Sequence, residues 1–125
     1  MVRKILAVTV LTGLTALTAS SALAAQLTAP VKRDGILVDD EYKTLYTNDT
    51  DPAGKSVCND ECAKAWTPLF ATSASKKKGE YSVIKRADGK RQWAYKGKPL
   101  YTSPNDKKSG DKTGDNADGV WHIVQ

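Results

Sequence analysis

The segment Leu45-Tyr46-Thr47-Asn48-Asp49-Thr50-Asp51 recurs 55 residues later as Leu100-Tyr101-Thr102-Ser103-Pro104-Asn105-Asp106. The leucine, tyrosine, threonine and terminal aspartate keep their spacing in both copies. A tryptophan follows each copy at the same distance, Trp66 after the first and Trp121 after the second. Self-similarity at a fixed period of this length indicates one supersecondary unit that is used twice. The sequence therefore predicts a duplicated fold.

The second copy contains the clearest hairpin of the sequence. Residues 81–86 and 91–95 have the composition of β-strands and flank a turn that ends at Gly89. A three-residue loop with Gly89 in the left-handed conformation would place Val83 opposite Trp93. We expect this register rather than that of a two-residue Asp-Gly loop, because it pairs a β-branched side chain with an aromatic one on the same face.

The copies differ in the segment that follows the repeated motif. In the first copy, Asn59 or Asp60 can cap a short helix after Cys58. In the second copy, residues 105–119 are too rich in Gly, Lys and Asp to hold a helix. We therefore predict a mainly β fold of seven or eight short strands with one short helix, in which two pseudo-symmetric repeats of about 50 residues pack as one small domain. An α+β fold is the alternative.

The beginning of the chain has the features of a signal peptide. Arg3 and Lys4 precede an apolar run over residues 5–17, and Ala22-Leu23-Ala24 offers small residues for cleavage. The apolar run is too short to remain as a membrane span. We expect cleavage near Ala24 and a periplasmic or secreted protein.

The predicted domain organisation follows from the cleavage site and the repeat. Residues 1–24 form the signal peptide and residues 25–125 a single domain. Within that domain, the repeats cover about residues 31–73 and 81–125, and a Ser/Lys-rich linker joins them.

The densest basic run, Lys76-Lys77-Lys78, lies in this linker. The whole chain has a formal net charge of +5 at pH 7, and Arg3 and Lys4 contribute to it. We expect a solvated loop, with an anionic surface as the alternative partner. We do not expect nucleic acid to bind, because no aromatic residues are interleaved with these lysines to stack on bases.

The two cysteines, Cys58 and Cys62, predict an intramolecular disulfide, which is the usual state of a cysteine pair in an exported protein. Cβ atoms at i and i+4 of a regular helix are too far apart for a normal bridge, so Cys58 should lie just outside the helix. A redox-active or metal-binding pair is the alternative.

Candidate metal ligands are sparse. His122 is the only histidine, and Asp49 and Asp51 resemble the start of a calcium loop that has Ala53 at its fifth position. His122, Asp49 and Asp51 are therefore weak metal candidates. We expect no cofactor.

Four aromatic residues recur at matching positions: Tyr46, Trp66, Tyr101 and Trp121. Repeated aromatics in a small domain usually form core. The sharper hypothesis is a paired aromatic platform that faces a ligand between the copies.

A longer combination of residues resembles a known family. The combination comprises Leu45-Tyr46, Asp51, Ser56, Cys58, Cys62-Ala63, Trp66 and Pro68-Leu69 in the first copy, and Arg86, Asp88-Gly89, Gly97, Pro99-Leu100-Tyr101, Gly119 and Trp121 in the second. This pattern, over about residues 35–125, is similar to the bacterial secreted-repeat family of unknown function, whose members are labelled predicted lipoproteins with a Y-x-[FWY]-x-x-D motif. Asp51 and Asp106 are the motif acids. Asn48 and Ser103 replace the motif's central aromatic, and the lipoprotein cysteine is absent.

No catalytic constellation of nucleophile, base and acid is recognisable in the sequence. We therefore expect an exported, non-catalytic binding or interaction module of the bacterial envelope rather than an enzyme. Its partner would be an envelope protein or a small ligand, and the protein would be a monomer without a membrane span. The alternative is an accessory protein for periplasmic redox, metal or haem chemistry.

Overall fold

Short strands make up most of the described part of the chain, which in this computed structural model comprises residue 13 and residues 25–125. The predicted signal peptide and its cleavage near Ala24 lie outside the described residues, apart from Gly13. Within the described residues, no helix has the length and apolar character needed to cross a membrane.

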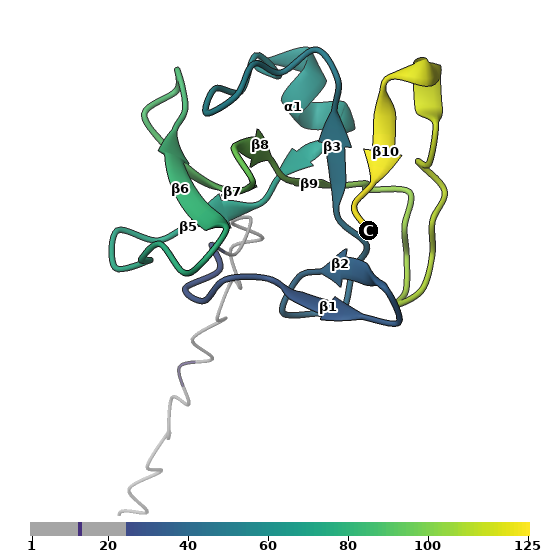
Figure 1. Ribbon diagram of the computed structural model, residues 1–125, viewed down its shortest axis with the longest axis horizontal. Helices are drawn as coiled ribbons and strands as arrows, with labels where there is room; N and C mark the ends of the chain where they lie inside the picture. The colour runs from purple at the N-terminus through teal and green to yellow at the C-terminus, as the bar shows by residue number, and fades with distance from the viewer. Residues whose placement is uncertain (1–12, 14–24) are drawn as a thin grey trace, which may run out of the picture.

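Ten strands, one α-helix and one 3-10 helix follow one another along residues 25–125 (Figure 1). They are β1 (Val31–Arg33), β2 (Ile36–Val38), β3 (Tyr46–Asn48), α1 (Glu61–Ala65), β4 (Thr67–Pro68), β5 (Phe70–Ala71), β6 (Tyr81–Lys85), β7 (Arg91–Tyr95), β8 (Lys98–Pro99), β9 (Tyr101–Thr102), η1 (Ala117–Gly119) and β10 (Trp121–Ile123). The predicted mainly β fold with one short helix is confirmed.

Three small antiparallel sheets arise from these strands. The β1–β2 hairpin forms one, β10-β3-β9-β4 forms the second, and β5-β7-β6 forms the third, with β8 also paired to β7. The second sheet mixes the copies, because β3 of the first copy lies between β9 and β10 of the second. Tyr46 of β3 is directly opposite Tyr101 of β9. The two copies therefore share a sheet and pack as one domain.

The prediction of seven or eight strands was too low, because Leu69 and Leu100 each divide an extended segment into two strands. Before Leu69 the chain pairs with β9 as β4, and after it the chain pairs with β7 as β5. Leu100 separates β8 from β9 in the same way. Leu69 N–H donates to the carbonyl of Leu100 at 2.9 Å, so the two crossing points lie side by side.

The predicted hairpin register of the second copy is confirmed. Val83 pairs with Trp93 in the β6–β7 ladder. Gly89 has a φ of 82°, and its N–H donates to the carbonyl of Arg86 at 3.0 Å. A left-handed residue at this position closes a three-residue loop at little steric cost when it is glycine.

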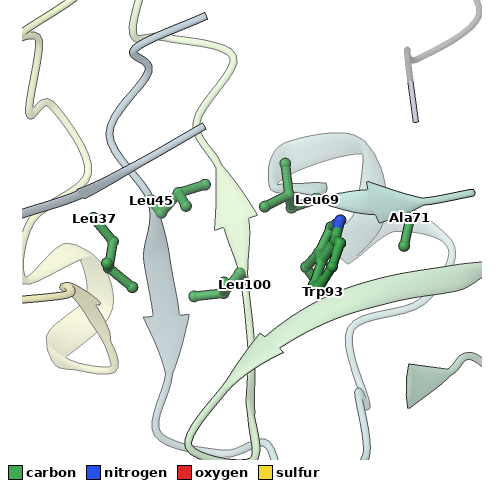
Figure 2. Close-up of a cluster of buried hydrophobic side chains, with 6 residues drawn as sticks. All are labelled: Leu37, Leu45, Leu69, Ala71, Trp93 and Leu100. Atoms are coloured by element: carbon green, nitrogen blue, oxygen red, sulfur yellow. The ribbon is translucent and has the colours of Figure 1, made fainter. Parts of the chain in front are cut away.

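The repeated Leu-Tyr pair divides the interior into two clusters, because successive residues of an extended chain point to opposite faces. Leu45 and Leu100 lie in the first cluster, where side chains from both copies converge (Figure 2). Tyr46 and Tyr101 lie in the second cluster. The first comprises Leu37, Leu45, Leu69, Ala71, Trp93 and Leu100, and the second Tyr46, Cys58, Tyr101 and Trp121.

The predicted asymmetry of the copies is also present. Helix α1 occupies the first copy, and Asp60 stands at its N-cap position without a side-chain capping hydrogen bond. The second copy spans the equivalent region with loop and the short η1. Figure 1 shows α1 at the end of the molecule opposite the β1–β2 hairpin, with β3 running between them.

Candidate functional site

The repeated tyrosines and aspartates exchange hydrogen bonds between the copies. The phenol of Tyr101 donates to Oδ2 of Asp51 at 2.6 Å, and the phenol of Tyr46 donates to Oδ2 of Asp106 at 2.7 Å. All four side chains are buried. Each tyrosine therefore binds the aspartate of the other copy, which is a reciprocal arrangement that the sequence spacing alone did not predict.

The second oxygen of each carboxylate holds the loop that follows it. Oδ1 of Asp51 accepts the N–H of Val57 at 2.8 Å, and Oδ1 of Asp106 accepts the N–H of Thr113 at 2.9 Å. A buried carboxylate needs such donors to offset its lost hydration. The motif acids thus connect the loop of their own copy to the tyrosine of the other copy.

Burial and these hydrogen bonds raise the pKa of both tyrosines. Loss of hydration is the larger cause for Tyr46 and Tyr101, and the hydrogen bond to Asp106 or Asp51 adds to it. The phenols are therefore neutral donors, and the carboxylates act as acceptors.

We expect the raised tyrosine pKa values to make the protein less stable in alkaline solution. Below the ordinary pKa of 10.0 both states keep the phenol protonated, and above it the unfolded state loses the proton first, so stability falls as pH rises. Ultraviolet titration should show fewer phenolates in the folded protein above pH 10.0 than in denaturant, where all five tyrosines ionise. A full five-tyrosine ionisation of folded protein near pH 10.0 would contradict this.

The four repeated aromatic residues meet in one stack. The rings of Trp66 and Trp121 are parallel within 9°, with centroids 3.9 Å apart. Tyr101 contacts Trp121 edge-on at 5.0 Å, and Tyr46 contacts Trp66 edge-on at 5.3 Å. Tyr46, Tyr101 and Trp121 are buried, whereas Trp66 is partly exposed. In this arrangement a ligand could reach the stack only through Trp66, because the other three rings pack against protein.

Gly114 closes part of the same stack. A Cβ atom on this residue would lie 2.8 Å from Cζ3 of Trp66 and closer still to Cη2. The N–H of Gly114 also donates to the phenol oxygen of Tyr46 at 3.3 Å. The loop of the second copy can lie flat on the indole of the first only because this position has no side chain.

Arg86 crosses the same interior from the hairpin of the second copy. Its guanidinium is buried and donates to the carbonyl of Cys58 at 2.9 Å, to Oε1 of Gln92 at 2.9 Å and to Oγ of Ser56 at 3.0 Å. The hydroxyl of Ser56 in turn lies 2.6 Å from the phenol oxygen of Tyr101. Arg86 therefore connects the cysteine loop to the tyrosine–aspartate pair.

The predicted disulfide between Cys58 and Cys62 is present, with Cα atoms 5.1 Å apart. Helix α1 begins at Glu61, so Cys58 lies outside it as expected. The bridge closes the loop whose carbonyl Arg86 binds.

Removing the disulfide with C58A/C62A should lower the free energy of unfolding by about 2 kcal/mol, because a five-residue loop is no longer closed in the unfolded state. Chemical denaturation with and without reductant measures this. Reduction should lower the stability of the wild-type protein by the same amount and leave the double variant unchanged. Equal wild-type stability in both conditions would contradict the role of the bridge.

Of the three weak metal candidates, His122 and Asp49 form a pair, whereas Asp51 lies apart from them in the interior. Nε2 of His122 lies 2.8 Å from Oδ2 of Asp49 in an exposed pair that joins β10 to the turn after β3. Asp51 instead binds Tyr101 in the interior. Among residues 25–125, no three His, Cys, Asp or Glu side chains come close enough together to hold a metal ion.

An open surface surrounds Val31, the first residue of β1, and residues 26–30, which lead into this strand and which we call the lead-in. Leu27, Ala29 and Val31 line a groove of about 480 Å³ together with Lys76–Lys78, and Ala29 and Val31 continue into a second groove of about 400 Å³ that ends at Tyr81 and Tyr95. We call this surface, formed by Leu27, Ala29, Val31, Lys32, Lys76, Lys77, Lys78, Tyr81 and Tyr95, the lead-in face.

Fold and site together define a duplicated β-module whose copies are joined by exchanged tyrosine–aspartate pairs. The family model of a secreted repeat of unknown function matches the chain twice, over residues 30–69 and 82–125. The chain therefore belongs to this family. The description of the family as secreted supports a periplasmic or extracellular location. Searches of curated proteins and of solved structures found no significant match.

Several residues of the interior escaped the sequence analysis as site residues. Ser56 and Arg86 were named only as parts of the pattern that resembles the secreted-repeat family, and Gln92, Thr113 and Gly114 were not singled out. Arg86 and Gln92 carried a weak signal, because a polar or charged residue beside an apolar strand position can be buried when it has partners. Gly114 lies among other loop glycines and had no distinguishing signal.

Proposed function

We propose that this protein is an exported module that binds a partner through the lead-in face and does not catalyse a reaction on it. The observation that carries the proposal is the exposed apolar surface of that face: Leu27 and Val31 keep 54% and 53% of their surface accessible. Large exposed apolar side chains that cluster beside charged residues are typical of interaction surfaces. The lead-in face also has the open grooves in which such contacts are made.

The hydrogen bonds of the motif residues support a structural rather than a catalytic role for the pattern that the two copies share. Tyr46, Tyr101, Asp51 and Asp106 are occupied by hydrogen bonds to one another and to loop N–H groups. Across residues 25–125, every buried side-chain nitrogen or oxygen has a hydrogen-bond partner. The interior groups thus hold the fold, and the surface is left to contact a partner.

Site-specific photo-crosslinking in the native envelope tests this proposal. A photoreactive side chain at Val31 or Lys77 should form an adduct with a partner, whether protein or lipid. The same probe at exposed Lys107, which lies in the loop of the second copy, should form none. Equal adducts at all three positions, or none at Val31 and Lys77, would contradict binding by this face. Turnover of the captured partner by the purified protein would contradict the non-catalytic role.

A further inference from the structure

The loop that carries Lys76–Lys78, which we call the lysine loop, is fixed against the lead-in by a buried residue, Gln26. Its backbone carbonyl accepts hydrogen bonds from Oγ of Ser75 at 3.1 Å and from Nε1 of Trp93 at 2.8 Å. Reciprocal backbone hydrogen bonds between Lys78 and Tyr81 close the other end of the loop. The predicted Ser/Lys-rich linker therefore has a defined conformation, and it presents its lysines beside the lead-in.

The lead-in face is strongly basic. Lys32 and Lys76–Lys78 are exposed, and the ion pairs found within residues 25–125 involve other residues. The first groove is lined by no acidic residue among those described, and the second by Glu80, whose carboxylate is 3.8 Å from the ammonium of Lys96. Four positive charges thus stand against one partly compensated negative charge, so the face is complementary to an anionic partner.

The shape of the face favours an extended surface over a small ligand. Leu27 and Val31 protrude into solvent rather than line a closed cavity. Asp39 and Asp40 line a third and smaller groove, which shares Ala29 and Val31 with the other two. The four lysines of the face outnumber the three carboxylates that line the grooves, Glu80, Asp39 and Asp40, so a planar anionic surface can meet the lysines and the two apolar side chains together.

We propose that the lead-in face binds the surface of an anionic phospholipid bilayer, with Leu27 and Val31 inserted among the headgroups and the four lysines against their phosphates. Protruding apolar side chains flanked by lysines are the pattern of proteins that lie at a membrane interface. The inference rests on the proposed binding function and names the partner. Gln26 also lies two residues beyond the predicted cleavage at Ala24, so the face is next to the point at which an exported precursor would leave the membrane.

Vesicle sedimentation of the processed protein tests the inference. The protein should sediment with vesicles of equal parts phosphatidylglycerol and phosphatidylcholine, less so as salt is raised, and not with phosphatidylcholine alone. Since each surface lysine contributes about fivefold to such binding, K76Q/K77Q/K78Q should lower the partition coefficient by about a hundredfold. The matched control K107Q/K108Q/K112Q removes the same charge from the loop of the second copy and should change the partition coefficient by less than about threefold. L27S/V31S should also weaken binding without changing the net charge.

Two results would overturn the inference. One is the absence of binding to the anionic vesicles; the other is an equal loss in both lysine triple variants, which would reflect net charge alone. If vesicles do not bind but polyglutamate binds and suppresses crosslinking at Val31, the partner is an acidic protein rather than a membrane. In that case the inference fails and the proposed binding function stands. If the face forms no crosslinked adduct and binds neither vesicles nor polyglutamate, both the membrane inference and the proposed binding function are contradicted.

Discussion

Replacing Arg86 by methionine is expected to lower the free energy of unfolding by about 3–5 kcal/mol, because two buried acceptors lose their donor and each costs about 1–3 kcal/mol. The acceptors are the carbonyl of Cys58 and Oε1 of Gln92. Ser56 loses one of its partners as well and would hold Tyr101 less firmly. A domain of this size has a total stability of about 5–15 kcal/mol, so the variant should be close to unfolded at moderate temperature.

The neighbouring variant K85M provides the control, since Lys85 is exposed at the end of β6. Denaturant unfolding of the two variants compares their midpoints directly. R86K should recover little of the loss, because a lysine ammonium cannot donate in the fork geometry of a guanidinium. Equal midpoints for R86M and K85M would show that the contacts of the guanidinium do not stabilise the fold.

Replacing Gly114 by alanine is expected to cost about 2–3 kcal/mol, because the new methyl group would overlap the indole of Trp66. To relieve the overlap, either the loop or the Trp66–Trp121 stack must move. Since the N–H of Gly114 also donates to Tyr46, displacement of the loop weakens the tyrosine–aspartate pair as well. Thermal unfolding and tryptophan fluorescence measure the two consequences.

A second substitution separates this steric effect from a change in the unfolded loop. In a W66L background the indole is absent, so G114A should cost no more than about 0.5 kcal/mol beyond W66L itself. An effect of G114A that is the same in both backgrounds would show that the contact with Trp66 is not its cause.

The sequence predicted the elements that local chemistry determines. Gly89 and the Val83–Trp93 pair specify the second hairpin because loop length and side-chain pairing select one register. Cys58 and Cys62 specify the bridge because few alternatives exist for two cysteines in an exported chain. Each of these predictions depends on residues close together in the sequence.

The sequence did not predict how the two copies interlock. A sequence repeat indicates two equivalent units. Nothing in the spacing of Tyr46 and Asp51 shows that each side chain forms its hydrogen bond with a residue of the other copy. The strand breaks at Leu69 and Leu100 depend on the same long-range pairing, and so does the burial of Arg86. The sequence grouped the four aromatic residues by their repeat positions, and in the structure three of the four rings are buried, because stacking with one another encloses them.

The interlocking also gives the fold a division of roles. The repeated motif of both copies faces inward and joins them, whereas the lead-in and the lysine loop, which have no matched pair, lie at the surface. A surface that occurs only once in the duplicated fold is consistent with a binding module that contacts its partner on one side. The proposed membrane contact uses this surface together with Val31 and Lys32, the first residues of the first repeat.

Double-mutant cycles on the tyrosines and aspartates test the central claim, which is that the copies are joined by reciprocal exchange. Cross-copy pairs, Y101F with D51N and Y46F with D106N, should show coupling energies of at least about 1 kcal/mol, since the partners share a buried hydrogen bond. Within-copy pairs, Y46F with D51N and Y101F with D106N, should be additive within about 0.5 kcal/mol. Coupling within the copies and additivity between them would contradict the account.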